Sequence, residues 1–143
     1  MTAPTVRAAR PADDARVDEL RRRAADEVAG RRGGPELLAT TGPAPADATT
    51  VLVAEVDGVV LAYASLEHRG DRLVLSELFT EPRAREVGLG HALVEAAVRA
   101  ARRLGCSAIE SVALPGDRDT KNFFESHGMR ARLLVVARDL DPT

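Results

Sequence analysis

Two glycines at the start of an amphipathic segment constrain the fold of this chain more than any other feature. The run Gly88-Leu89-Gly90 follows an apolar stretch, Leu73 to Thr80, and a proline, Pro82, that prevents a strand from continuing. Apolar residues then recur at helical spacing as far as Leu104. The order of strand, tight turn and glycine-rich helix start predicts a β–α unit whose turn leads directly into the helix.

This turn has the chemistry of an anion-binding site. The first amides of a helix have no internal acceptor, and the helix dipole favours an anion there. Glycines let the backbone approach a phosphate, and Arg83 and Arg85 add positive charge beside the turn. The sequence has no Gly-Lys-Ser/Thr, and Leu93 stands where a dinucleotide fingerprint needs a third glycine. We therefore predict a diphosphate-binding turn over Arg85 to Gly90 that is neither of these motifs.

The remaining segments alternate between strand and helix patterns. Asp57-Gly58 separates two β-rich runs and predicts a hairpin, because both turn residues would take positive φ. The other expected elements are a short strand from Thr5 to Arg10, a helix over about 13–29, a loop from Arg31 to Thr50 with one helical turn at Glu36 to Ala39, hairpin strands Val51 to Val56 and Val59 to Leu66, a helix from Gly88 to Leu104 with Gly105 as its C-cap, a strand from Ser107 to Leu114, a helix from Asp119 to His127 and a strand from Ala131 to Asp139. This order predicts an α/β fold with a mixed sheet and helices on both faces.

Length, charge and composition exclude several classes of protein. The 143 residues suit one domain, and a net charge of -2 predicts neither a nucleic-acid partner nor an anionic membrane. Cys106 is the only cysteine, and the three histidines are far apart in the sequence, so we expect no metal. No run resembles a signal peptide or reaches membrane-spanning length, so a cytoplasmic location is expected.

Three segments together resemble the GNAT family of acetyl-CoA-dependent N-acetyltransferases. The run from Leu78 to Gly90 resembles its motif A, with Arg/Gln-x-x-Gly-x-Gly/Ala placed three residues after a proline. The run from Asn122 to Met129 resembles its motif B, an aromatic pair followed by an acid and a glycine, and the run from Val6 to Asp13 is similar to the family's first strand and helix. The resemblance implies a single domain over 1–143, with a mixed sheet of six or seven strands and about four helices.

The same resemblance implies where acetyl-CoA binds. It places the pantetheine arm between two parallel strands, Leu73–Thr80 and Ser107–Leu114, that splay apart, and it places the pyrophosphate on the amides of the glycine-rich turn. The cofactor-binding residues that it implies are Leu78, Phe79, Thr80, Arg85, Glu86, Val87, Gly88, Leu89, Gly90 and Phe124. Dimers are common among such relatives, so a homodimer is one of the expected states.

Three positions depart from the family pattern. Phe124 stands where a Tyr often protonates the leaving thiolate, Asp117 stands where an Asn often faces the cofactor, and Thr120 replaces a common Ala. Because Phe124 cannot donate a proton, either solvent or another hydroxyl must do so, or catalysis has been lost. A non-catalytic acyl-CoA-binding regulator or assembly subunit is therefore the alternative function, and a nucleotide-binding module that uses the same turn is a third.

The acceptor amine must be neutral to attack, although a free alkylamine has a pKa of about 10.4. A carboxylate could take its proton, directly or through water. Glu77 is the predicted base because several relatives place a Glu on this strand, and Glu81 and Glu67 are alternatives.

The sequence thus predicts transfer of acetyl from acetyl-CoA to a primary amine by direct attack in a ternary complex. The acceptor could be a small amine, an amino acid, an antibiotic or a protein amine, held by the segment from Asp13 to Thr50.

Overall fold

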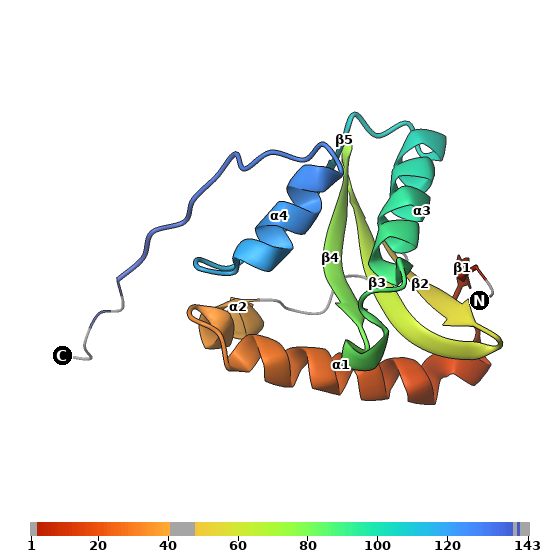
Figure 1. The fold of residues 1–143 in the computed structure, drawn as a ribbon. Coiled ribbons are helices and arrows are strands. Elements are labelled where there is room, and N and C mark those ends of the chain that lie inside the picture. Colours follow the sequence, from red (N-terminus) through yellow and green to blue (C-terminus); the bar gives the residue numbers. More distant parts are fainter. Residues whose placement is uncertain (1–2, 41–47, 139, 141–143) are drawn as a thin grey trace.

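A computed structural model describes residues 3–40, 48–138 and 140, and no helix in these ranges is long and apolar enough to cross a membrane. Five strands form one sheet in the order β1-β2-β3-β4-β5, in which only β4 and β5 are parallel (Figure 1). The elements are β1 (Thr5–Ala8), α1 (Asp14–Ala29), α2 (Gly34–Thr40), β2 (Thr49–Val56), β3 (Val59–Arg69), β4 (Arg72–Thr80), α3 (Leu89–Arg103), β5 (Ala108–Glu110) and α4 (Arg118–Ser126), with 3-10 turns at Pro11–Asp13 and Pro82–Ala84.

The hairpin between β2 and β3 confirms the prediction made from Asp57-Gly58. The φ angles are 52° at Asp57 and 80° at Gly58, which is the pair of left-handed conformations that a two-residue hairpin turn requires. Asp57 is the only non-glycine residue with positive φ in the part of the chain that the structure describes. Local turn chemistry therefore sets the pairing of Val56 with Val59 next to the turn, and the register shifts once beyond it, between Ala54 and Glu55.

Helices cover the two faces of the sheet and divide the core into two clusters. On one face α1 contributes Val17 and Leu20, which pack with Val53, Tyr63 and Phe79. On the other face α3 and α4 pack over a second set of buried residues: Ala54, Ala62, Ala64, Leu66, Leu73, Leu75, Ala84, Leu89, Leu93, Val94, Ala97, Ala101 and Phe124. Figure 1 shows α1 crossing below the carboxyl end of β4, so this helix borders the turn that leads into α3.

The predicted strand from Ala131 to Asp139 is wrong. Residues 131–138 form no strand and run away from the sheet (Figure 1), and Asp139 lies outside the described residues. Leu133 to Val136 keep between 77% and 84% of their surface exposed. The apolar pattern of this segment suits a strand, but β-structure also needs a partner edge, and the segment pairs with none. Within the described residues the sheet consequently has five strands instead of six or seven.

Two other elements differ in length from the prediction. The strand expected from Ser107 to Leu114 is reduced to Ala108–Glu110, and where its backbone pairing ends the Ser111 hydroxyl donates to the Leu75 carbonyl at 2.8 Å. The single helical turn expected after Arg31 is a longer helix, α2, while residues 41–47 of the same predicted loop lie outside the described part.

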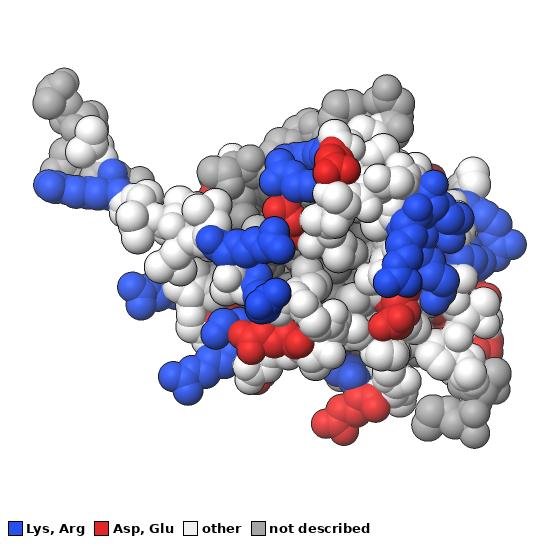
Figure 2. Space-filling model, turned by 90° about the horizontal axis from the view of Figure 1, so that it is seen from above, with Lys and Arg blue, Asp and Glu red and all other residues white. Residues whose placement is uncertain are grey.

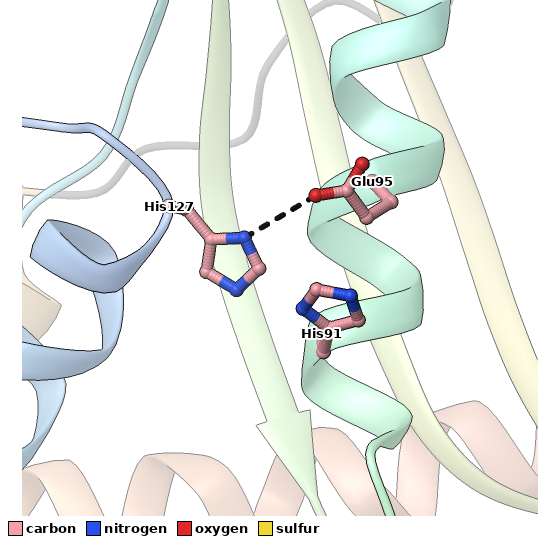
Figure 3. A group of neighbouring side chains, drawn as sticks. All are labelled: His91, Glu95 and His127. Carbon is pink, nitrogen blue, oxygen red and sulfur yellow. Dashed lines mark ion pairs between the residues drawn. The ribbon is translucent and has the colours of Figure 1, made fainter.

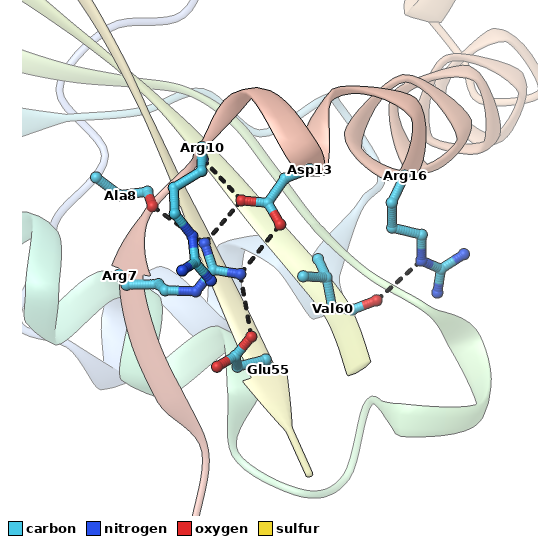
Figure 4. Close-up of polar contacts among 7 residues, drawn as sticks. All are labelled: Arg7, Ala8, Arg10, Asp13, Arg16, Glu55 and Val60. Atoms are coloured by element: carbon cyan, nitrogen blue, oxygen red, sulfur yellow. Dashed lines mark hydrogen bonds and ion pairs between the residues drawn. The ribbon is translucent and has the colours of Figure 1, made fainter. Parts of the chain in front are cut away.

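An ion-pair network joins the first strand to the first helix (Figure 4). The Arg7 guanidinium donates to both Asp13 carboxylate oxygens, at 2.7 and 3.0 Å, and to Glu55 at 3.1 Å. The backbone amide of Arg10 also donates to Asp13, at 2.7 Å. The hydrogen bonds from Arg7, and then the one from Arg10, hold the pKa of the Asp13 carboxyl well below its usual range. This network fixes where the chain leaves β1 and enters α1.

We expect Asp13→Asn to lower the melting temperature at pH 7 and to lower it less at acid pH. A carboxyl whose folded pKa is depressed contributes stability above its unfolded pKa of about 3.9, and that stability is lost as the pH falls toward the folded pKa. The measurement is the difference in melting temperature between variant and wild type at pH 7 and near pH 3. Asp18→Asn, at an exposed site, is the control. A difference that stays constant with pH would contradict this role for Asp13.

Candidate functional site

The sheet opens between β4 and β5, as the predicted splay requires. Their parallel pairing covers only three residue pairs and ends at Val74 and Glu110. β4 then continues to Thr80 with no strand beside it on that side, in the part of the chain described. The confirmed opening therefore begins in the middle of β4.

A β-bulge lies at the start of this opening. The register between β3 and β4 shifts at Ser65/Leu66, which makes Ser76 an additional residue in β4, and the Ser76 hydroxyl donates to the Ser65 carbonyl at 3.2 Å. Leu75 and Leu78 consequently both pack on the α3 face, although three positions separate them. Glu77 is thereby turned to the α1 face of the sheet. Bulges often redirect a side chain in this way next to active sites.

Glu77 lies between a helix and the neighbouring strand. Its carboxylate accepts a hydrogen bond from Arg21 of α1 at 2.9 Å, and the Arg21 guanidinium lies 5.4 Å from the centre of the Tyr63 ring on β3. Burial, followed by the negative charge of Glu77, raises the pKa of the Tyr63 phenol well above its usual value, so this group keeps its proton at neutral pH. Neither neighbour of Glu77 is predicted from the sequence; the available signal is that Tyr63 is the only tyrosine.

Glu81 is a buried carboxylate that is fully engaged in ion pairs, so it is not a free base. Its carboxylate pairs with Arg16 at 2.7 Å, Arg83 at 2.9 Å and Arg23 at 3.3 Å. Burial opposes the charge of Glu81, but the hydrogen bonds from Arg16 and Arg23 outweigh it and lower the pKa of this carboxyl. The Glu81 carbonyl accepts from the Ala84 amide at 2.8 Å and so also shapes the turn. Arg83, expected to serve the phosphate, is engaged here instead.

The other alternative base, Glu67, lies at a different part of the sheet. It pairs with Arg69 of the same strand, and in the register of β3 with β4 it stands opposite Val74, where β5 is still paired. Of the three predicted carboxylates, Glu77 is the one that lies within β4 beyond the end of its pairing with β5.

The start of α3 has the backbone geometry expected of an anion site. Gly88 is the N-cap with a φ of 82°, a left-handed conformation that favours glycine. No side chain caps the helix, and the first intrahelical bond runs from the Ala92 amide to the Gly88 carbonyl at 3.0 Å. The amides from Leu89 to His91 therefore have no intrahelical acceptor. This is the position predicted for the pyrophosphate.

Gly90 has a different neighbour from the one expected. A Cβ built on this glycine would lie 3.3 Å from Cζ of Phe123, whereas one built on Gly88 would meet nothing within 4 Å. From the sequence, both glycines are expected to leave room for a phosphate. In the structure the space beside Gly90 is filled by an aromatic ring of α4, so this glycine is needed first for contact between α3 and α4.

Arg85 folds back onto the end of β4. Its Nε donates to the Thr80 carbonyl at 3.1 Å, its terminal nitrogen pairs with Glu27 of α1, and its guanidinium lies 5.4 Å from the centre of the Phe79 ring. The residue is thus where the prediction puts it, beside the turn. However, it occupies a backbone acceptor that the resemblance assigns to pantetheine.

The motif B residues on α4 take mainly packing and capping roles in the structure. Phe124 is 8% exposed and belongs to the core under α3, with its ring centre 5.6 Å from that of Phe123. Asp117 caps α4 by accepting from the Thr120 amide at 3.2 Å. Two departures from the family pattern, Asp117 and Thr120, therefore form one helix cap, because the Thr120 hydroxyl also donates to Asp117 at 2.7 Å.

Charges of both signs surround the site. On the face seen from above, basic side chains lie in the left, central and right parts of the view, with carboxylates among them (Figure 2). Arg31, in the short segment between α1 and α2, pairs with Asp117 at 3.1 Å and so links that segment to the start of α4. The site is thus bordered by ion pairs that hold its surrounding helices together.

Comparisons with known proteins identify the family. The model of the acetyltransferase (GNAT) family matches residues 15–129, and the chain therefore belongs to this family. No curated protein gives a significant match. The runs from Leu78 to Gly90 and from Asn122 to Met129 lie within this range, and the run from Val6 to Asp13 lies just before it. The family assignment therefore agrees with the resemblance found in the sequence.

Solved structures show the same fold at low identity. An AAC(6')-Iy structure in complex with the bisubstrate analogue CoA-S-monomethyl-acetylneamine is 18% identical, with a TM-score of 0.75 over 98% of this chain and 100% of that chain. A ribosomal-protein-alanine N-acetyltransferase from Brucella melitensis biovar Abortus 2308 is 16% identical, with a TM-score of 0.74 over 97% and 100%. A transcriptional regulator from Bacillus halodurans C-125 is 18% identical, with a TM-score of 0.69 over 96% and 99%. At these identities the likeness establishes the fold alone.

We expect Gly90→Val to destabilise the protein through Phe123 as well as to weaken acetyl-CoA binding. Overpacking of a filled site typically costs about 1–3 kcal/mol of unfolding free energy. In the double variant Gly90→Val/Phe123→Ala the clash is relieved, so the loss of melting temperature should be smaller than the sum of the losses in Gly90→Val and Phe123→Ala, while acetyl-CoA affinity stays low. Thermal melts and titration calorimetry measure the two effects. Unchanged affinity in both variants would remove Gly90 from the cofactor site.

Proposed function

We propose that this member of the GNAT family moves an acetyl group from acetyl-CoA to a primary amine by direct attack in a ternary complex. The observation that carries the proposal is the opening of β4 from β5 together with the uncapped start of α3. A thioester could lie in the opening while the diphosphate meets the free amides of the helix. A related fold solved with CoA, the aminoglycoside N-acetyltransferase AAC(6')-Iy, supports an acyl-CoA cosubstrate.

In this proposal the cofactor follows β4 and then the turn. The backbone of Leu78, Phe79 and Thr80 borders the pantetheine arm, and the amides from Glu86 to Gly90 face the pyrophosphate. Arg85 must release or share the Thr80 carbonyl if pantetheine uses it, because its Nε donates to that oxygen. Phe124 supports this path from the core side, where it is buried under α3.

The proposed reaction forms one bond and breaks one. The neutral amine attacks the thioester carbonyl carbon, an amide C–N bond forms, and the C–S bond breaks to release CoA thiolate. Glu77, held by Arg21, takes the amine proton through water, and solvent returns a proton to the thiolate. Tyr63 is a positioning residue for Glu77, since its phenol stays protonated and lies beside that carboxylate.

A second function is supported by one specific observation. Phe124 cannot protonate a leaving thiolate, and its burial in the core means that the ring is needed for packing whether or not catalysis occurs. A non-catalytic acyl-CoA-binding regulator or assembly subunit would keep the same cofactor path. A measurement of turnover distinguishes the acetyltransferase from the non-catalytic binding protein.

Acetyl-CoA should bind and stabilise the fold. Ligand at a hundred times its dissociation constant adds about 2.7 kcal/mol to the unfolding free energy, which thermal melts with acetyl-CoA, CoA and ATP would detect. CoA release in the presence of pooled primary amines then tests the transfer itself. Stabilisation by acetyl-CoA without CoA release would favour the binding protein, and stabilisation by ATP alone would favour a nucleotide-binding module. A melt unchanged by millimolar acetyl-CoA would contradict both acyl-CoA functions.

Glu77→Gln should slow turnover without changing acetyl-CoA affinity. General-base assistance is worth about 10²–10⁴-fold in rate, and the loss should shrink as the pH approaches the amine pKa of about 10.4, where more amine is neutral without help. Steady-state kinetics with an amine found in the pool, measured from neutral to alkaline pH, check this. The matched control is Glu81→Gln, which should lower the melting temperature because three arginines lose their anchor. Wild-type rates for Glu77→Gln at neutral pH would assign the base elsewhere.

A further inference from the structure

The fold brings two of the three histidines together with a carboxylate at the side of α3. His91 and Glu95 lie one turn apart on α3, and His127 directly follows the end of α4 (Figure 3). The ring centres of His91 and His127 are 4.8 Å apart, and Nδ1 of His127 lies 3.5 Å from a carboxylate oxygen of Glu95. One potential ligand atom from each residue lies within 4.8 Å of the others.

We propose that His91, Glu95 and His127 form a binding site for a transition-metal ion of the Zn²⁺ type. Two imidazoles and one carboxylate are a ligand set that zinc accepts, with water filling the fourth position. Metal–ligand bonds of about 2.0–2.2 Å place ligand atoms roughly 3.4 Å apart in a tetrahedral site. Because the ligand atoms now lie within 4.8 Å of one another, each distance between them needs to shorten by at most about 1.4 Å for the cluster to close around an ion.

The burial of the three residues permits this contraction. The His127 side chain is only 6% exposed, and its ring packs edge-on against Phe123 with centres 4.9 Å apart, so it is the fixed ligand. Glu95 is 49% exposed, and His91 is also exposed, so both can change rotamer at little cost. Figure 3 shows both side chains of α3 directed toward the His127 ring. A buried imidazole with two mobile ligands in reach is a built site, with an open side toward solvent.

The types of ligand select among metal ions. Imidazole nitrogens suit Zn²⁺, Ni²⁺, Cu²⁺ and Co²⁺, whereas Mg²⁺ and Ca²⁺ prefer sites made of oxygen ligands. A simple ion pair between Glu95 and a protonated His127 would explain that contact but gives no role to His91. Sequence spacing could not reveal the site, because the third ligand comes from a different helix.

Binding of an ion would tie the end of α4 to the first turns of α3. Phe123 lies between them: it contacts Gly90 on one side and the His127 ring on the other. The ion would therefore fix the packing of motif B against motif A. It would bind whether or not the chain transfers acetyl groups.

The experiment uses full-length, untagged protein that has been stripped with a chelator and then exchanged into chelator-free buffer. Titration calorimetry with Zn²⁺ should show one ion per chain, and Co²⁺ should give visible absorption bands of a site with nitrogen ligands. We expect His91→Asn to lose Zn²⁺ affinity by at least about tenfold, the smallest loss usual even for residues that only support a metal ligand. Glu95→Gln and His127→Asn should show losses of the same kind. Mg²⁺ should give no heat of binding at this site.

Matched controls keep the test decisive. His68→Asn removes the third histidine and Cys106→Ser the only thiol, and both should bind Zn²⁺ like the wild type. Because His91 is exposed, its variant should melt like the wild-type protein without metal, and Zn²⁺ should raise the melting temperature of the wild type and of the two control variants but not that of His91→Asn. Absence of stoichiometric Zn²⁺ binding would overturn the proposal. It would also be overturned if His91→Asn kept wild-type affinity, or if His68→Asn or Cys106→Ser lost as much affinity as His91→Asn.

Discussion

The buried carboxylate of Glu81 is the interaction on which the rest of the site depends. A buried charge is tolerated only when it is paired and hydrogen-bonded, and three arginines supply those partners. Two of them, Arg16 and Arg23, come from α1, so the ion pairs hold that helix under the end of β4. The Glu81 backbone meanwhile bonds to Leu61 and Ala84, which ends the strand and begins the turn. The position at which α3 starts thus depends on the ion pairs and backbone hydrogen bonds of Glu81.

At the same end of the sheet, a single extra residue in β4 places the proposed base and the core residues on opposite faces. Ser76 interrupts the alternation of β4, and as a result Leu78 continues the core under α3 while Glu77 meets Arg21 on the opposite face. Without the bulge, Glu77 would point into the apolar cluster, where an unpaired carboxylate is strongly unfavourable. The bulge also lies close to where β5 leaves β4, so the opening and the carboxylate arise at one place.

The sequence was a good guide where local chemistry decides the structure. The Asp57-Gly58 turn, the amphipathic helix α3 and the position of Gly88 follow from backbone preferences and short-range periodicity, and they were predicted correctly. It was a poor guide to elements that need a distant partner. The segment from Ala131 onward has a strand-like composition, yet in the structure it finds no edge to pair with. The partners of Glu77 were missed for the same reason, since Arg21 and Tyr63 are far from it in the chain.

The sequence by itself determined the family, the order of most elements and the glycine-rich turn that precedes α3, where an anion can bind. These features depend on short motifs and on residue spacings within one element. Only the tertiary structure decided which charges are free and which are engaged. It showed that Arg83 and Arg85 are paired, that the space beside Gly90 belongs to Phe123, and that His91 and His127 come together. Such contacts join elements across the core, and their geometry depends on how the helices cross the sheet, which local periodicity does not encode.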